Sequence, residues 1–263
     1  MHSVSPGKTR QPPRDAAGRL AAVLAGLIAQ ARRDLGRMKQ DPDAAIHVLR
    51  RRMKKLDSLL RLARDAMPKH ARRELERETG SLKGLFAAQR DFAVSVKLAR
   101  RIGGEPLARA IERERPLPPA GITAQARKSV NAMARLLRGV PVASLSRKRV
   151  LARQQRAEQR AMQAWREALR KPSAVRLHAW RRRAKIVHHH LLFQRALGGG
   201  QRRRIQLADH IGHWLGELHD LHVLEQTLAR CAVDPHLWRE ALTQRERRLE
   251  ARALRAGRSL HAG

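Results

Sequence analysis

His47-Val-Leu-Arg50-Arg51-Arg52-Met-Lys54 is a cationic stretch that returns 131 residues later as His178-Ala-Trp-Arg181-Arg182-Arg183-Ala-Lys185. On a helix, with about 100° between successive residues, each copy separates into two faces. One face is apolar and carries Leu49, Met53 and Trp180. The opposite face is basic, and its members are His47, Arg50, Arg51, Lys54, His178, Arg181, Arg182, Lys185 and His189. A basic helix that occurs twice predicts an anion site with two sides.

An aspartate follows each copy of the basic stretch at nearly the same distance. Asp91 lies 44 residues after His47, and Asp220 lies 42 residues after His178. Two elements repeated in register indicate an internal duplication, so we expect residues 42–102 to superpose on residues 173–230 about a pseudo-twofold axis. Because carboxylates repel phosphate, we expect Asp91 and Asp220 to stand behind the site, each orienting an arginine of its own half.

The remaining pattern is typical of an all-α protein. Apolar residues recur at helical spacing, no segment alternates with period two, and tyrosine is absent. Prolines, glycines and capping residues predict helices over about 15–40, 42–61, 69–102, 123–138, 144–170, 173–197, 201–230 and 235–254. Residues 1–14 are expected to form a flexible basic tail. The folded part then spans 15–258, with repeat one over about 15–139 and repeat two over about 144–258.

The charge predicts an anionic partner. Among 263 residues, 57 are Lys or Arg, 46 of these are arginine, and the formal net charge is +34. Such charge repels itself unless a polyanion or counterions neutralise it, and the planar arginine fork suits phosphate. A genome rich in arginine codons would explain part of the excess, so the placement of these residues matters more than their number. Aromatic residues make up only 3% of the chain, whereas proteins that bind single-stranded nucleic acid usually add aromatic stacking platforms.

Cysteine content and hydropathy favour the cytoplasm. Cys231 is the only cysteine, so no disulfide can form within the chain. An apolar run at residues 20–31 resembles a signal peptide, but its helical stripe continues to Leu35 and favours a first bundle helix instead. No run approaches the ~18 apolar residues needed to span a bilayer. We therefore expect a cytoplasmic protein that does not enter a membrane.

The chain resembles the CHAD family, named after its histidine-bearing α-helical domain. The resemblance rests on the two basic helices and on the later segments Arg90-Asp91-Phe92-Ala-Val94 and Leu215-Gly216-Glu217-Leu218-His219-Asp220-Leu-His-Val223. It covers about 15–258 and implies two four-helix bundles related by a pseudo-twofold, whose basic helices face each other across a central cleft and bind inorganic polyphosphate. The matching positions are His47, Arg50, Arg51, Lys54, His178, Arg181, Arg182 and Lys185. The chain departs from the pattern at His219, where the first half has Arg90, and at the run His188-His189-His190.

Two other functions stay open from the sequence: a nucleic-acid or ribosome-associated basic protein, and a metal-dependent hydrolase of short phosphate chains. A metal would need the helical stripe Asp209, His213, Glu217 and Asp220, but neighbouring arginines offer these carboxylates other partners. The run Glu74-Leu-Glu76-Arg-Glu78 is similar to the glutamates of triphosphatases, which lie on a strand, whereas this run favours a helix. No glycine-rich phosphate loop occurs. We therefore expect a binding protein without cofactor, metal or catalytic residues, with polyphosphate as its partner, polyphosphate granules as a target, and nucleic acid as a secondary partner.

Overall fold

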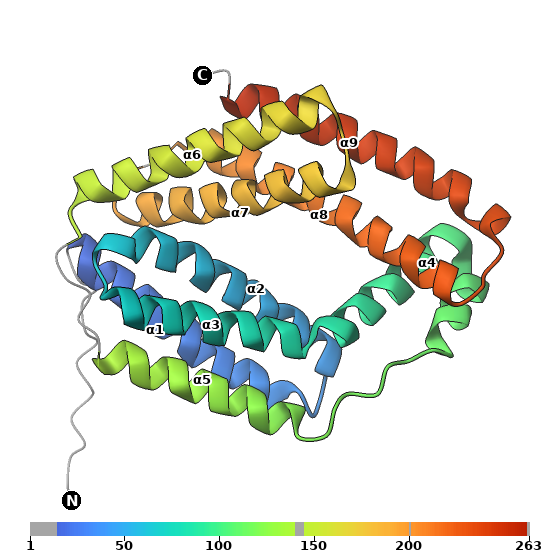
Figure 1. The fold of residues 1–263 in the computed structure, drawn as a ribbon, viewed down its shortest axis with the longest axis horizontal. Helices are drawn as coiled ribbons and strands as arrows, with labels where there is room; N and C mark the ends of the chain where they lie inside the picture. The colour runs from blue at the N-terminus through green and yellow to red at the C-terminus, as the bar shows by residue number, and fades with distance from the viewer. Residues whose placement is uncertain (1–14, 140–144, 200, 262–263) are drawn as a thin grey trace, which may run out of the picture.

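Every regular element is a helix in the part of the chain that the structure, a computed structural model, describes, namely residues 15–139, 145–199 and 201–261. The all-α prediction is therefore confirmed. In chain order (Figure 1), the elements are α1 (Ala16–Arg37), α2 (Pro42–Leu62), the 3₁₀ turn η1 (Ala63–Asp65), α3 (Lys69–Leu85), α4 (Ala87–Glu112), α5 (Ile122–Gly139), α6 (Arg147–Arg170), α7 (Ala174–Ala196), α8 (Arg202–Arg230), η2 (Pro235–Leu237) and α9 (Arg239–His261). The predicted tail at 1–14 and Pro141, which lies between the two predicted repeats, are outside the described residues.

Capping residues place the starts of the helices that matter most for the site. Asp41 accepts a hydrogen bond from the backbone N–H of Ala44 at 3.0 Å, and Pro42 occupies the first helical position of α2. Ser173 caps α7 in the same way, through the backbone N–H of Arg176 at 3.3 Å. Each cap satisfies a donor that the helix itself cannot pair, which stabilises the helix by roughly 1 kcal/mol. Both predicted starts are confirmed.

The single helix predicted over 69–102 is wrong, because the chain turns there. Phe86, with φ −109° and ψ 24°, separates α3 from α4, and its side chain is buried. The glycines expected to end this helix do interrupt it, since Gly104 has φ +73°, but a helical turn containing Pro106 resumes and reaches Glu112. Proline is tolerated in the first turn of such a segment. The break at Phe86 lets α4 leave α3 and pack against α8 (Figure 1).

Two hydrophobic clusters form the core. The first joins α1, α2, α3 and α5, with additions from α6 and α7 such as Val150 and Phe193. The second joins α6, α7, α8 and α9 around the fully buried Trp180, and it also takes in α4 from the first half. Two cores are consistent with the two bundles that the family resemblance implies. The division into repeats near residue 140 and the pseudo-twofold axis stay predictions.

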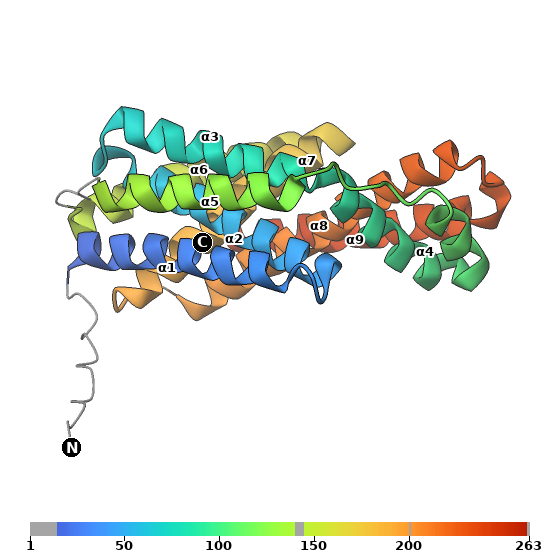
Figure 2. The same ribbon diagram turned by 90° about the horizontal axis from the view of Figure 1, so that it is seen from below.

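The two duplicated helices, α2 and α7, are neighbours in the middle of the molecule and run in the same direction (Figures 1 and 2). Near their C-terminal ends, Ser58 of α2 meets α7 through His189 and His190. One turn earlier, Lys54 interacts electrostatically with Arg181. The fold therefore brings together basic residues that lie about 130 positions apart in the sequence. Within residues 15–139, 145–199 and 201–261, no helix combines the length and the apolar character required to cross a membrane.

Candidate functional site

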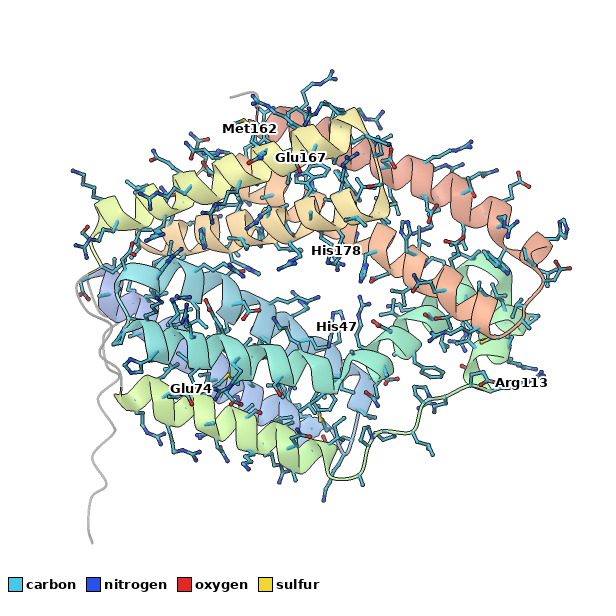
Figure 3. All side chains as sticks on the ribbon, viewed as in Figure 1. His47, Glu74, Arg113, Met162, Glu167 and His178 are labelled. Carbon is cyan, nitrogen blue, oxygen red and sulfur yellow. The ribbon has the colours of Figure 1, made fainter. Side chains whose placement is uncertain are left out.

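Basic side chains from three helices gather where α2, α7 and α4 approach one another. Lys54 is close enough to Arg181 and His178 for electrostatic repulsion to lower pKa values in this group, and Lys185 and Arg51 repel each other in the same way across the junction. Figure 3 shows His47 and His178 on the sides of α2 and α7 that face the middle of the molecule. We call this set the central basic cluster; its members are His47, Arg50, Arg51 and Lys54 of α2, Arg90 of α4, and His178, Arg181, Arg182 and Lys185 of α7.

The members of the central basic cluster differ in their exposure to solvent and in whether their side chains contact other parts of the protein. The residues His47, Arg51, Lys54 and Arg182 are exposed to solvent. The side chains of these four residues form no hydrogen bond or ion pair within the part of the chain that the structure describes. The remaining members are at least partly buried and pack against neighbouring helices. A ligand arriving from solvent would therefore meet the exposed residues first.

Arg50 is held by the end of a neighbouring helix. Its guanidinium donates a hydrogen bond to the carbonyl oxygen of Lys83, in the last turn of α3. Carbonyl groups at a helix C-terminus lack partners in their own helix, so a cation there is stabilising. Burial lowers the pKa of Arg50, and Arg90 adds to that effect. Arg50 thus fixes α2 against α3 and contributes positive charge from behind the exposed residues.

Two glycines on α8 make room for the basic side chains of α7. A Cβ atom at Gly212 would lie 2.5 Å from Cε of Lys185, and one at Gly216 would lie 3.5 Å from Nη2 of Arg181. The two side chains therefore lie flat against α8 at positions one turn apart. Lys185 continues to Asp209, where Nζ is 3.4 Å from Oδ1. In the sequence, the signal for this contact is a pair of glycines four residues apart on one helix.

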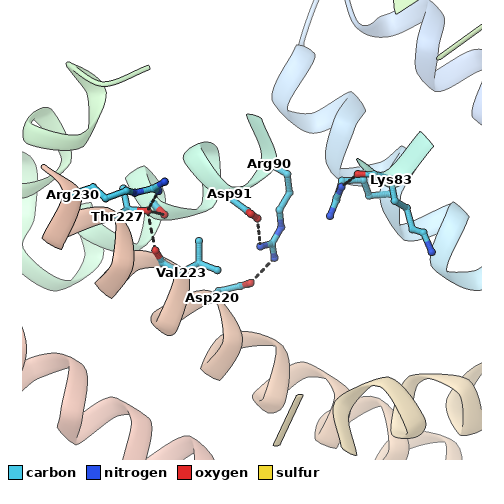
Figure 4. A network of polar contacts seen from close by, with 9 residues as sticks. Lys83, Arg90, Asp91, Asp220, Val223, Thr227 and Arg230 are labelled. Atoms are coloured by element: carbon cyan, nitrogen blue, oxygen red, sulfur yellow. Dashed lines mark hydrogen bonds and ion pairs between the residues drawn. The ribbon is translucent and has the colours of Figure 1, made fainter. Parts of the chain in front are cut away.

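Arg90 connects the two halves of the chain (Figure 4). Its Nη1 donates to Oδ1 of Asp91 at 2.9 Å, and its Nη2 donates to Oδ1 of Asp220 at 2.5 Å. The prediction that each aspartate orients an arginine of its own half holds for Asp91 and is wrong for Asp220, whose hydrogen-bonded arginine lies in the other half. The reason is that α4 swings toward α8 after the break at Phe86, which places Arg90 between the two carboxylates.

His219 occupies the position in the second half that Arg90 occupies in the first. Its ring lies 4.9 Å from the ring of His178, centroid to centroid, with the planes tilted by 50°. Burial lowers the pKa of His219 to about 4, with Arg181 and His178 adding to the effect. Burial and Arg181 also lower the pKa of His178. The two rings line a mostly apolar cavity of about 360 Å³, and both are neutral near pH 7.

Lys54 has an unusual electrostatic setting for a residue that touches solvent. Its pKa is lowered to about 7, first by the density of protein atoms around the ammonium group and then by Arg181 and Arg90. The residue as a whole is exposed, but neighbouring side chains crowd its ammonium group, so partial loss of hydration is the largest cause of the lowered pKa. About half of the Lys54 side chains are therefore charged near neutral pH.

The histidine run on α7 has structural partners. His189 lies with Nδ1 2.9 Å from Oγ of Ser58, and burial lowers its pKa to about 2. His190 is also buried, and its Nε2 donates to the carbonyl oxygen of Ser58 at 2.8 Å. His188 approaches the carbonyl oxygen of Ile205 at 3.3 Å. The predicted role of His189 as an anion contact stays untested, but its visible role is to join α7 to α2 as a neutral side chain.

The carboxylates weighed as metal ligands have cations beside them. Asp209 lies 3.7 Å from His188 and close to Lys185, while Glu217 lies 3.4 Å from Arg245 and 3.7 Å from Arg101. Over the described residues, no three histidine, cysteine or carboxylate side chains come together as a metal site. The glutamates of α3 likewise pair with nearby arginines, Glu76 with Arg72 at 2.6 Å.

Comparison with known proteins bears on the family and the fold of the chain. The family model for the CHAD domain matches residues 20–229 of the chain. Among solved structures, PptA from Streptomyces chartreusis is similar with a TM-score of 0.61 and 15% sequence identity, over 96% of this chain and 98% of that chain. At this identity the likeness shows a shared fold alone. A search of curated proteins found no match.

Proposed function

The chain belongs to the CHAD domain family, and from that premise we propose that it binds inorganic polyphosphate along a groove at the central basic cluster, which recruits it to polyphosphate granules in the cytoplasm. The observation that carries the proposal is that two duplicated basic helices lie side by side, and that their exposed cationic side chains form no ion pair with a carboxylate of the described residues. Arg51, Lys54 and Arg182 belong to this group. Unpaired cations held close together repel one another, and an anionic chain relieves that repulsion.

Polyphosphate suits this surface better than nucleic acid does. A phosphate chain carries about one negative charge per unit at neutral pH and has no bases, so its receptor needs a row of cationic donors and no stacking platform. The central basic cluster supplies arginine and lysine from α2, α4 and α7, and it contains no Phe or Trp. Arginine forks give directional contacts to phosphate oxygens, while the flexible lysine stems follow a chain that bends.

The surroundings of the cluster favour binding over catalysis. Asp91 and Asp220 both accept hydrogen bonds from Arg90, and a guanidinium bound to a carboxylate makes that carboxylate a weaker base and a poorer metal ligand. His219, the histidine next to Asp220, is neutral at physiological pH. Hydrolysis of a phosphate chain needs an activated water, which in metal-dependent enzymes is held by carboxylates or by a metal ion. We therefore propose a binding module that leaves its ligand intact.

Competition between anions tests the proposed function. At about 150 mM salt, long-chain polyphosphate should displace labelled duplex DNA and RNA from the protein, whereas neither nucleic acid should displace polyphosphate at equal phosphate concentration. Polyphosphate affinity should also fall steeply with added salt, because each phosphate contact releases a counterion. Displacement of polyphosphate by RNA would favour the nucleic-acid alternative. Release of free phosphate in the presence of magnesium would overturn the assignment as a binding protein.

Polyphosphate affinity is expected to fall by up to about tenfold per unit as the pH rises above 7, because of Lys54. In the free protein the pKa of this lysine is about 7, and a bound anion raises it by favouring the ammonium form. The contribution of the Lys54 charge to polyphosphate affinity is thus complete below pH 7, and it is lost as the pH rises through the higher pKa that Lys54 has in the complex. Calorimetry in buffers of different ionisation enthalpy should detect the proton taken up on binding. The variant Lys54→Arg should bind without this uptake; an unchanged uptake would exclude Lys54 as its source.

A further inference from the structure

A second basic pocket lies outside the central basic cluster. It is a cavity of about 320 Å³ between the end of α2, η1, the start of α3 and the middle of α6 and α7. We call it the Arg183 pocket. Seven arginines line it, accompanied by two carboxylates and three other side chains: Arg61, Arg64, Arg72, Arg153, Arg156, Arg160 and Arg183, with Asp65, Glu76, Ala157, Ile186 and His190.

The charge inside the Arg183 pocket is only partly balanced by the protein. Arg153 donates to Asp65 at 2.8 Å, and Arg72 donates to Glu76 at 2.6 Å. These two pairs use both carboxylates of the lining. Within residues 15–139, 145–199 and 201–261, no hydrogen bond or ion pair engages the other five arginines, which are Arg61, Arg64, Arg156, Arg160 and Arg183. Five positive charges around one cavity repel each other unless an anion enters.

The internal duplication shows what is missing from this pocket. Arg183 is the third arginine of its triplet, and the matching residue in the first copy is Arg52. Arg52 donates to the buried carboxylate of Asp34 on α1 at 2.5 Å and also reaches Gln30. For Arg183, the neighbouring helix α6 presents Arg160 to the same pocket instead, and Arg160 with Arg61 adds to the burial that lowers the pKa of Arg183. The first copy supplies its own counter-ion, whereas the second leaves the position open to an external one.

Two buried polar atoms of the lining also lack partners. Among the described residues, Nε of Arg72 finds no acceptor, and Nδ1 of His190 has no hydrogen bond although the residue is only 2% exposed. Because Nε2 of His190 faces the carbonyl oxygen of Ser58, that nitrogen carries the hydrogen. Nδ1 is therefore an acceptor, and it can accept a hydrogen bond from a protonated phosphate oxygen. Unpaired buried polar groups are costly, so a ligand that satisfies them gains affinity.

We infer that the Arg183 pocket is a second anion site, which takes a compact molecule carrying several phosphate groups. The limited volume fits a short oligophosphate or a small phosphorylated ring rather than a long chain. The lining contains no Phe or Trp, so a nucleotide base would find no stacking partner. This site is independent of the proposed function, because it can hold its ligand whether or not the central basic cluster holds long-chain polyphosphate.

Isothermal titration with tripolyphosphate at about 150 mM salt tests the inference. The variant Arg156→Gln, Arg160→Gln and Arg183→Gln should weaken tripolyphosphate at least tenfold and change long-chain polyphosphate affinity by less than about threefold. The matched control Arg247→Gln, Arg248→Gln and Arg252→Gln removes the same charge from exposed positions of α9 and should leave tripolyphosphate binding unchanged. A second titration uses inositol hexakisphosphate in place of tripolyphosphate. The probe whose shape matches the ligand of the pocket, a ring or a linear chain, should bind more tightly than the other, and both should bind more tightly than inorganic phosphate.

Several outcomes would overturn the inference. Equal loss of tripolyphosphate affinity in the pocket variant and the α9 control would assign the binding to net charge. Failure of the wild-type protein to bind either probe would show that the pocket is not a site for them. Loss of tripolyphosphate affinity only when Arg51, Lys54 and Arg182 are replaced would place the short chain in the central basic cluster. By contrast, a protein that binds tripolyphosphate through Arg183 but ignores long chains would support this inference and contradict the proposed function.

Discussion

Replacing Arg51, Lys54 and Arg182 together by glutamine is expected to weaken long-chain polyphosphate binding about a hundredfold at about 150 mM salt. For each phosphate contact that is lost, fewer counterions are released on binding. The slope of log affinity against log salt then falls by roughly 0.7 to 0.9 per contact, and the affinity at this salt falls by roughly fivefold. A fluorescence titration at several salt concentrations measures both quantities. The slope of log affinity against log salt should become shallower by about two units.

These three residues give a cleaner test than the more buried members of the cluster. Arg50 holds the end of α3 and Arg181 lies against α8, so replacing either would disturb packing as well as charge. Exposed residues without partners can be changed at a cost within about 0.5 kcal/mol of folding stability. Circular dichroism and the denaturation midpoint should therefore match those of the wild-type protein.

The α9 residues Arg247, Arg248 and Arg252 provide the matched control for net charge. They are exposed and have no hydrogen bond or ion pair to other described residues. Their replacement by glutamine removes the same three charges and should change polyphosphate affinity by less than about threefold, because distant charges are screened at this salt. If the control variant lost as much affinity as the cluster variant, the net charge of the protein would account for binding and the central basic cluster would have no special role.

The parts of the fold that depend on local chemistry could be predicted from the sequence. Asp41-Pro42 and Ser173 mark the starts of α2 and α7 because capping satisfies backbone donors within a few residues. The apolar faces of both helices are buried as the 3.6-residue period requires, Leu49 and Trp180 among them. The duplication and the family resemblance together predicted that α2 and α7 lie near each other.

Features that depend on long-range geometry could not be predicted in this way. The break falls at Phe86, which is neither glycine nor proline, and it accompanies the packing of α4 against α8. The pairing of Arg90 with Asp220 depends on that break and joins residues 130 positions apart. The Arg183 pocket is assembled from α2, η1, α3, α6 and α7, and no single segment carries its pattern. Duplication predicted similar halves, whereas Arg90 against His219 and Arg52 against Arg183 are positions where the two halves differ in their contacts.

The substitution Asp220→Asn is expected to lower the free energy of unfolding by about 2 to 3 kcal/mol in the absence of ligand. The Arg90–Asp220 ion pair is largely buried, with the two side chains 11% and 20% exposed. Removing the Asp220 charge leaves the Arg90 guanidinium with Asp91, so a buried positive charge loses one of its two carboxylate partners. The Asp220 charge also supports the charged forms of His47, Lys54 and Arg181, whose mutual repulsion would otherwise grow. Denaturant unfolding, followed by circular dichroism, measures the loss.

Polyphosphate should reverse much of this loss, because a bound polyanion supplies the negative charge that Asp220 no longer provides. The removed carboxylate also repelled phosphate, so Asp220→Asn should bind polyphosphate more tightly than the wild-type protein and gain more stability from it at the same ligand concentration. Asp91→Asn is the control: its side chain is 41% exposed, so the same change should cost less than about 1 kcal/mol. A variant Asp220→Asn that is destabilised and also binds more weakly would show that Asp220 orients Arg90 for the ligand, and that its geometry matters more at this site than its charge.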